Sequence, residues 1–277
     1  MKTLKALKSR REGIEKINKI ARAMEVIAAT RLRRFEERTL RFRPYILAQQ
    51  SLIENLTLRL KKIKSIWTEP VKNKKGLAIL ISSDRGFCGG FNNQLFQLIK
   101  NLNNNQSFSF IAVGKKGATF LKKHNFNLIF ESALPQLNQM SEIIQSLSEK
   151  IISNYCEERQ RIYLIFNKFR RNLLGQSFLR QLFPLQAHKK EEVVLDYLVE
   201  PDMEVLLEEL LFLYVHSEIK AAILESKAAE EMARMVAMTQ ATRSAEDLIK
   251  GLTLEYHKAR QAGITKELIE IANAVTY

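Results

Sequence analysis

The C-terminal part of the chain reads MEVLLEELLFLYVHSEIKAAILESKAAEEMARMVAMTQATRSAEDLIK over residues 203–250. This segment contains neither proline nor glycine and is rich in Ala, Glu, Leu and Met, which favour the α-helix. At about 1.5 Å per residue, one helix of this length would extend roughly 70 Å, more than a compact domain can cover. We therefore predict a long helix from Met203 to the end of the chain that projects from the rest of the protein.

A second long helix is predicted from Leu4 to about Lys64, with a bend at Pro44. Apolar residues recur in it with the 3,4 spacing of a coiled-coil seam. The predicted seam consists of Leu7, Ile14, Ile17, Ala21, Met24, Ala28 and Phe35. The C-terminal helix has a seam of smaller residues, namely Ile219, Ala222, Ser226, Ala229, Ala233, Val236 and Gln240. Because small side chains allow close approach, we expect the two ends of the chain to form an antiparallel coiled coil.

Between these helices the sequence changes to short apolar runs separated by helical patterns. We divide the chain into an N-terminal coiled-coil helix (1–70), an inserted α/β domain (71–202) and a C-terminal coiled-coil helix (203–277). Strands are expected at 76–82, 108–113, 128–131, 161–167, 178–185 and 193–198, and helices at 92–102, 115–124 and 139–155. Such alternation indicates a mostly parallel, Rossmann-like sheet with helices on its faces.

The net charge of +14 is concentrated in the first quarter of the chain. Residues 1–75 contain 21 Lys+Arg and 7 Asp+Glu, whereas residues 76–277 contain 23 of each. A basic segment of this kind predicts an acidic partner, which could be nucleic acid, anionic lipid or an acidic protein surface. The arginines of this segment (Arg31, Arg33, Arg34, Arg38, Arg41 and Arg43) are suited to binding phosphates, but most charge runs are solvated helix faces. Trp67, the only tryptophan, lies outside this run, which weakens the nucleic-acid interpretation.

Catalysis has little support in the sequence, and no cofactor is expected. The two cysteines and four histidines lack the spacing of a disulfide framework or a metal site. The segment SDRGFCGGFN (83–92) follows the first predicted strand, yet it lacks the lysine and hydroxyl of a P-loop and the spacing of G-x-G-x-x-G. We interpret it as a tight strand-to-helix turn with Cys88 as a packed thiol. The consecutive acid pairs Glu208/Glu209 and Glu230/Glu231 are interpreted as helix-surface acids.

Membrane insertion and secretion are not indicated by the sequence. The most apolar stretch falls short of the roughly 20 residues that a spanning helix needs. The basic N-terminal segment contains no apolar core of a signal peptide. We therefore expect a soluble, intracellular protein that attaches to membranes only through partners.

Three segments, taken together, resemble the gamma subunit of F-type ATP synthases. They are KIARAMEVIAA (19–29), DRGFCGGFN (84–92) and, near the C-terminus, ARMVAM (233–238) with KARQAGITKELIEI (258–271). The resemblance implies a non-catalytic rotor subunit of the F1 sector, whose coiled coil turns inside a ring of three alpha and three beta subunits. It also implies contacts with the epsilon subunit and the c-ring, coupling of proton flow to ATP synthesis, and regulation of ATPase activity and proton flow.

The resemblance further implies which residues contact the beta subunit. Met24 matches a position that lies against an acidic beta loop. Arg234 and Gln261 match residues that form a polar catch with beta, supported by Thr265 and Glu267. Alternatives remain open, since Met24 at a seam position would also serve packing, and Thr265 with Glu267 would also suit a helix start.

Two further matches, Tyr197 and Glu200, imply contacts of the foot region with the c-ring and epsilon. The lack of a transit-like leader, and of the cysteine-bearing insertion of plastid versions, favours a peripheral protein on the cytoplasmic face of a bacterial inner membrane. Two other hypotheses remain at this point. One is a basic coiled-coil nucleic-acid-binding protein, and the other is a nucleotide-using enzyme built on the α/β domain.

Overall fold

The computed structural model describes residues 3–60, 67, 69, 71, 75–103, 108–136, 139–170, 173–185 and 203–275. The chain divides into two compact units. One unit combines Met1–Ala29 with Arg234–Tyr277, and the other is Thr30–Ala233. Both terminal helices contribute residues to each unit.

The terminal helices are α1 (Leu4–Leu60) and α5 (Met203–Val275), as the sequence predicts. α1 continues through Pro44 without interruption. The two helices run antiparallel within each unit, because residues later in α1 contact residues earlier in α5. The contacts in the unit Thr30–Ala233 include Arg31 with Glu231 and Gln50 with Glu218, and those in the other unit include Arg11 with Tyr256 and Glu25 with Thr239.

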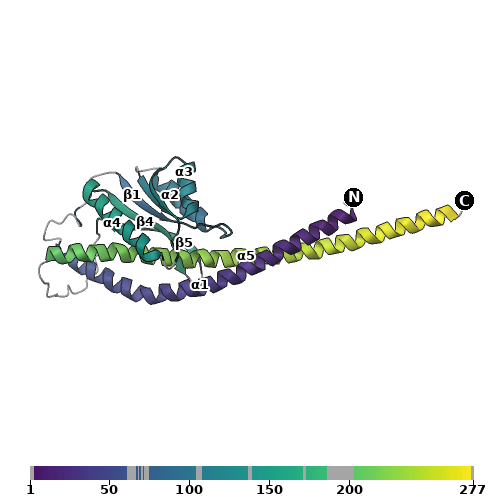
Figure 1. The fold of residues 1–277 in the computed structure, drawn as a ribbon, viewed down its shortest axis with the longest axis horizontal. Helices are drawn as coiled ribbons and strands as arrows, with labels where there is room; N and C mark the ends of the chain where they lie inside the picture. The colour runs from purple at the N-terminus through teal and green to yellow at the C-terminus, as the bar shows by residue number, and fades with distance from the viewer. Residues whose placement is uncertain are drawn as a thin grey trace. The chain divides into compact units, whose positions relative to one another are not determined.

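The inserted domain contains a five-stranded sheet with the order β3-β2-β1-β4-β5 (Figure 1). Strands β1 (Gly76–Ile81), β2 (Phe108–Val113), β3 (Asn127–Ser132) and β4 (Arg161–Arg170) are parallel, and β5 (Leu173–Phe183) is antiparallel to β4. The helices of the domain are α2 (Phe91–Asn103), α3 (Lys115–Lys123) and α4 (Met140–Glu158). Every residue of β1 is buried, as expected for a central parallel strand that is covered on both faces.

The predicted fold class is therefore confirmed, and most element bounds agree within three residues. The largest difference is at β5, which begins at Leu173 rather than at residue 178 because its pairing with β4 extends to the hairpin end. The predicted strand at 193–198 lies outside the described residues. Within the described parts of the chain, no helix has a stretch long and apolar enough to cross a membrane.

The seam of α1 differs from the predicted one at alternate positions. Buried or half-buried residues recur every seven positions, at Leu7, Ile14, Ala21, Ala28 and Phe35, as predicted. The second seam position lies four residues after each of these, at Arg11, Asn18, Glu25, Leu32 and Thr39. The prediction of Ile17 was wrong, because its side chain is 60 % exposed. Polar residues occupy several of these second positions. The spacing of apolar residues therefore indicates their neighbours, such as Ile17 next to Asn18 and Met24 next to Glu25.

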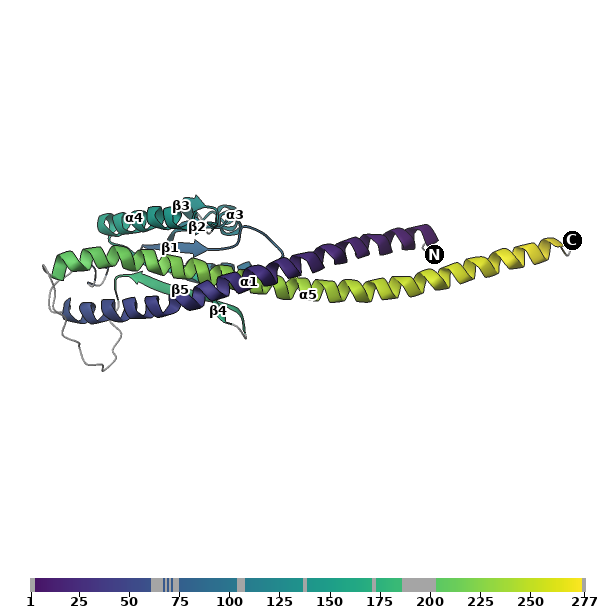
Figure 2. The ribbon, with the colours of Figure 1, turned by 60° about the horizontal axis from the view of Figure 1, so that its bottom comes forward.

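The predicted seam of α5 is confirmed only as far as Ala233. Its later members Val236 and Gln240 are exposed, whereas Met238 and Thr242 are buried in their place. In the unit Thr30–Ala233, α5 lies between α1 and most of the α/β domain in both ribbon views (Figures 1 and 2). A helix enclosed on several sides buries more than one stripe, so residues outside the predicted seam, such as Ile223 and Ala228, are buried there as well.

Gly114 follows β2 and connects it to α3. Its φ of 116° lies in a region that residues with a side chain rarely adopt. A Cβ atom at this position would also collide with the backbone carbonyl of Ser82. The close approach of Gly114 to Ser82 brings the first turn of α3 near the end of β1. There the Ser82 hydroxyl accepts a hydrogen bond of 2.8 Å from the amide of Gly117. Glycine is therefore required here for both conformation and space.

Replacing Gly114 by alanine should lower the free energy of unfolding by roughly 2–4 kcal/mol, since strain and overpacking add. Urea unfolding followed by the fluorescence of Trp67, which is buried and stacks on Tyr155, measures this. The control is Gly86→Ala, where a Cβ would meet nothing within 4 Å, and it should change the same quantity by less than about 1 kcal/mol. Equal effects of the two substitutions would contradict this explanation.

Candidate partner-contact surfaces

The helix pair of residues 3–29 and 234–275 has a seam that is polar as well as apolar. Ala21 and Ala28 of α1 and Ala245 of α5 are buried, which lets the helix backbones approach closely. Next to these alanines, the Thr239 hydroxyl donates a hydrogen bond of 2.8 Å to Oε1 of Glu25. A half-buried carboxylate needs such a partner, because burial without one is costly. This pair therefore helps to set the register of the two helices.

Met24 lies beside this polar contact and is half-buried. It precedes the seam residue Glu25 and follows the buried Ala21 by three positions. Part of its side chain therefore packs within the helix pair, and part remains on the surface. This placement is compatible with both of its predicted roles, which are packing in the helix seam and contact with an acidic loop of the beta subunit.

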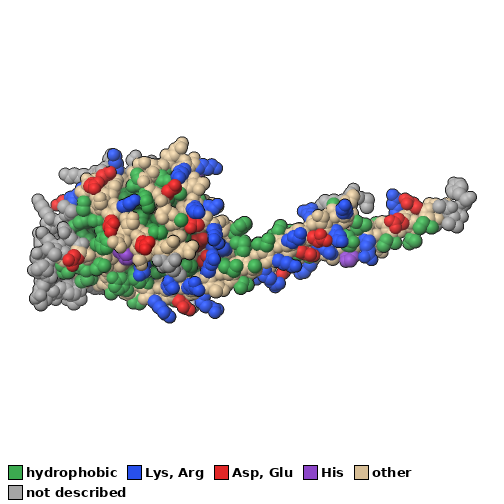
Figure 3. Space-filling view, viewed as in Figure 1, with side chains coloured by type: hydrophobic (Ala, Val, Ile, Leu, Met, Phe, Trp, Pro, Cys, Tyr) green, Lys and Arg blue, Asp and Glu red, His purple; other side chains and the backbone are tan. Residues whose placement is uncertain are grey.

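An exposed apolar flank, defined by Ile17, Ile20, Val26 and Ile27, lies on the same part of α1. The side chains of these four residues are between 51 % and 63 % exposed. The exposed Lys19 lies among them in the sequence. Figure 3 shows the same mixture of apolar and basic side chains along the terminal helices. A group of large, exposed apolar residues is typical of a surface that binds a partner.

Arg234 is buried, with only 6 % of the residue exposed. It lies 27 positions before Gln261 on α5, which corresponds to roughly 40 Å along a helix. The structure therefore does not bring Arg234 and Gln261 together within the chain. Nothing in the sequence indicates that Arg234 is buried, since the family resemblance implies only a contact with the beta subunit.

Gln261 and Thr265 share one exposed face of α5. They line a shallow, open hollow of about 690 Å³ together with Lys258, Ala262, Lys266, Ile269 and Glu270. The Thr265 hydroxyl donates a hydrogen bond of 2.9 Å to the backbone carbonyl of Gln261, so it is already engaged within the helix. Glu267 is exposed but lies about 200° around the helix from Thr265. One flat partner surface would therefore meet Gln261 and Thr265 but not Glu267.

Tyr197 and Glu200, the predicted contacts with the c-ring and epsilon, lie outside the described residues.

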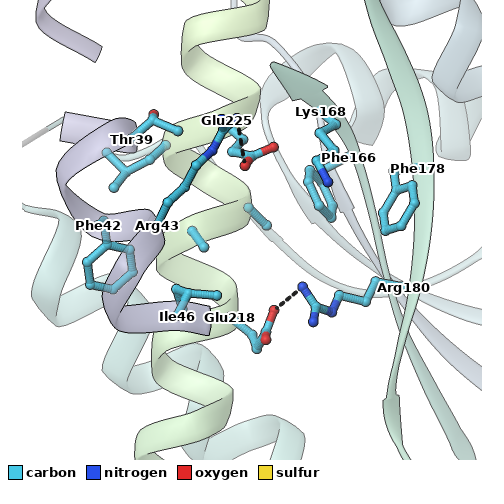
Figure 4. Close-up of a pocket in the computed structure, with 13 residues that line it drawn as sticks. Thr39, Phe42, Arg43, Ile46, Phe166, Lys168, Phe178, Arg180, Glu218 and Glu225 are labelled. Atoms are coloured by element: carbon cyan, nitrogen blue, oxygen red, sulfur yellow. Dashed lines mark hydrogen bonds and ion pairs between the residues drawn. The ribbon is translucent and has the colours of Figure 1, made fainter. Parts of the chain in front are cut away.

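The junction between the α/β domain and the terminal helices is held by two ionic contacts, one at the buried Glu218 and one at the half-buried Glu225 (Figure 4). Arg180 of β5 forms an ion pair of 2.9 Å with Glu218 of α5, and Gln50 of α1 donates to the same carboxylate at 2.7 Å. Arg43 of α1 donates to the backbone carbonyl of Phe169 in β4 at 3.1 Å, and its guanidinium lies 3.4 Å from Oε1 of Glu225. Each contact joins segments that are far apart in the sequence. We call the side chains that form these contacts the junction network, namely Arg43, Gln50, Arg180, Glu218 and Glu225.

Glu218 is the most deeply buried member of the junction network. Only 2 % of Glu218 is exposed, and this burial raises the pKa of its carboxyl, although Arg180 and the hydrogen bond from Gln50 oppose the shift. Burial likewise raises the pKa of the neighbouring Tyr214 hydroxyl, and the charge of Glu218 adds to the effect. A carboxylate buried in this way depends on its partners for its ionised state.

The acids Glu230 and Glu231 are also buried, so their interpretation as surface acids was wrong. Glu231 lies 3.7 Å from the guanidinium of Arg31 on α1. Both acids lie in the part of α5 that α1 and the α/β domain enclose. Their burial results from this tertiary arrangement, which local sequence spacing does not reveal.

The glycine-rich segment after β1 serves as a structural turn, as interpreted from the sequence. The Asp84 carboxylate accepts hydrogen bonds from the backbone amides of Lys115 at 2.9 Å and Leu134 at 3.1 Å, so it joins the ends of three strands. The Asn92 amide donates to the Ser83 hydroxyl at 2.7 Å and contacts the sulfur of Cys88. Cys88 is buried, and its interpretation as a packed thiol is confirmed.

Comparisons with known proteins identify the family. A family model described as "ATP synthase" matches residues 3–276. The chain is 30 % identical to the ATP synthase gamma chain of Chloroherpeton thalassium, with 99 % of each chain covered. It is 34 % identical to that of Geotalea uraniireducens, with 98 % of this chain and 97 % of the relative covered. The chain belongs to the ATP synthase gamma chain family.

Solved structures agree with this family assignment at the level of the fold. A chain from the Euglena gracilis mitochondrial ATP synthase, solved as an OSCP/F1/c-ring assembly, matches with a TM-score of 0.69 at 15 % identity. The match covers 99 % of this chain and 93 % of that chain. A chain of the Tetrahymena thermophila central stalk and c-ring structure matches with a TM-score of 0.61 at 23 % identity, over 80 % of this chain and 99 % of that one. The gamma-chain fold thus extends over nearly the whole length described here.

The buried Glu218 makes the stability of this gamma chain depend on pH in a predictable direction. Because the folded carboxyl has a raised pKa, the folded state holds a proton at pH values where the unfolded state has lost it. Lowering the pH from about 7.5 to about 5 should therefore stabilise the wild type relative to Glu218→Gln, by on the order of 1 kcal/mol.

Urea unfolding of both proteins at the two pH values measures this difference. Glu209→Gln is the control, because Glu209 lies on the same helix but is exposed. Comparison of the two variants separates the effect of the buried position from that of removing a carboxylate from the same helix. A flat or reversed pH dependence for Glu218→Gln would show that the carboxyl is not held in the environment described above.

Proposed function

We propose that this chain is the central-stalk rotor subunit of the F1 sector of an F-type ATP synthase. In this role its paired terminal helices turn inside a ring of three alpha and three beta subunits. Its α/β domain and foot engage the epsilon subunit and the c-ring, whose turning by proton flow drives ATP synthesis. The observation that carries the proposal is the match to gamma chains along the full length of the sequence.

The physical properties of the chain suit a rotor. A rotor must be stiff, and its surface must differ around its axis, so that each orientation favours a different conformation of the same partner. α1 and α5 are both long, and Pro44 is the only proline within Leu4–Leu60 and Met203–Val275. The junction network adds ionic contacts that resist sliding of α5 against β5 and α1.

The proposed contacts with the beta subunit are those that the family resemblance implies. They are Met24, Arg234, Gln261, Thr265 and Glu267, and the proposed contacts with the c-ring and epsilon are Tyr197 and Glu200. The exposure of Gln261, Thr265 and Glu267 supports a role on the surface. For the buried Arg234 we propose a supporting role within the helix pair, with beta meeting the surface around it.

The chain is proposed to have no catalytic site of its own, so nucleotide chemistry takes place in its partners. The proposed location is the cytoplasmic face of a bacterial inner membrane, to which the chain is bound through the c-ring. The bacterial gamma chains that it resembles support this location. None of the relatives named above supports the nucleic-acid-binding alternative.

Co-expression with the alpha and beta subunits of the same organism tests the proposal. The purified complex should contain three alpha, three beta and one gamma chain and should hydrolyse ATP, whereas alpha and beta alone should do so much more slowly. Failure of this chain to join the complex, or an ATPase activity that is the same without it, would overturn the proposal.

Gln261→Ala should lower the ATPase activity of this complex roughly 2–10-fold, the effect of losing one interfacial hydrogen bond. Thr265→Val should have a smaller effect, because the Thr265 hydroxyl already bonds within the helix. Lys250→Ala is the control, since Lys250 is an exposed residue of α5 outside the proposed contacts. An unchanged ATPase activity for Gln261→Ala would show that Gln261 does not form the proposed polar contact with the beta subunit.

A further inference from the structure

A basic cavity lies among α1, the first turn of α4 and α5, within the unit Thr30–Ala233. Its volume is about 350 Å³, which is in the range of small-ligand sites. Arg38 and Arg41 line it from α1, and His216 and Lys220 line it from α5. Among the described residues that line the cavity, none is acidic. Three side-chain cations from two helices therefore converge on one concave space.

The arginines of this cavity differ from the other arginines of the basic segment. Arg31 and Arg43 are engaged by Glu231 and Glu225, as described above. No ion pair joins Arg38 or Arg41 to another described residue, and both are exposed. The sequence suggested that this segment could bind phosphates. Arg38 and Arg41 are the members of the segment that line the cavity, whereas the exposed Arg33 and Arg34 do not line it. An Arg guanidinium offers donors in a fork that matches phosphate oxygens.

Lys220 adds a positive charge to the cavity from α5, and His216 lies beside it in the lining. The ammonium of Lys220 lies 4.9 Å from the ring centroid of Phe42, which holds it at the cavity wall. Burial and the charge of Lys220 both lower the pKa of His216. An anion bound in the cavity would offset the charge of Lys220 and would therefore raise the pKa of His216.

The start of α4 supplies further donors at the same place. α4 has 19 residues, and its N-cap residue Gln139 makes no side-chain capping hydrogen bond. Ser141, in its first turn, lines the cavity with its neighbour Met140. The first backbone amides of a helix and its dipole favour an anion. The helix start thus adds to the attraction of the three cations for negative charge.

We propose that this cavity binds a phosphate group. A phosphate dianion concentrates two charges and several acceptor oxygens in a small volume, which suits three cations that converge with a hydroxyl and helix amides. A single carboxylate carries one charge, so it would leave most of this positive charge uncompensated, whereas one phosphate supplies two charges at one point. The phosphate is either free, as inorganic phosphate or pyrophosphate, or belongs to a lipid headgroup. The proposal does not depend on the rotor function.

Titration calorimetry of the full chain with inorganic phosphate and with pyrophosphate tests the site. Binding should weaken at least about tenfold in the double variant Arg41→Gln/Lys220→Gln, which removes two charged donors. The control is Arg33→Gln, because Arg33 is exposed on α1 but does not line the cavity. Vesicles with and without an anionic phospholipid distinguish a lipid source, and a poly-glutamate peptide represents an acidic protein.

A second readout is independent of heat signals and of folding defects in the variants. The pKa of His216, followed by NMR in the wild type, should rise when phosphate or pyrophosphate is added. Binding of phosphate, pyrophosphate or anionic vesicles that the double variant loses and Arg33→Gln keeps supports the site. No binding by any of these probes, an equal loss in both variants, or binding of poly-glutamate alone would overturn it.

Discussion

The enclosure of α5 between α1 and the α/β domain is the constraint on which the unit Thr30–Ala233 depends. Ala222, Ala228 and Ala229 are at most 2 % exposed, so there is almost no room for larger side chains there. Close packing of this kind makes helix and domain move together, because protein interiors deform little. The same enclosure buries Glu218 and Glu231, which then require Arg180, Gln50 and Arg31 as partners.

These charged contacts contribute specificity more clearly than stability. A buried ion pair gains little over well-packed apolar residues, whereas loss of one partner is strongly destabilising. Arg180 and Gln50 reach Glu218 from two different elements, so only one register of α1, α5 and β5 satisfies all three. In the proposed rotor, this property would keep the terminal helices and the α/β domain in one fixed arrangement while torque passes between them.

Much of the fold could be predicted because its signals are local. The six apolar residues of β1 and the heptad spacing of Ala21 and Ala28 identify elements without reference to distant residues. The missed features depend on tertiary partners. Glu25 at a seam position is explained by Thr239, and no local pattern connects the two. The proposed contacts of Met24 and Gln261 came from family resemblance, since a surface residue carries no local mark of the partner that it meets.

In the proposed function this chain rotates within the complex that it forms with alpha and beta subunits. Cys156 provides a natural attachment point for a probe, because its thiol is exposed on α4 whereas that of Cys88 is buried. A bead attached to Cys156 should rotate in steps and in one direction when the immobilised complex of alpha, beta and this chain hydrolyses ATP. A bead that remains stationary while the same complexes hydrolyse ATP would contradict the proposed rotor function.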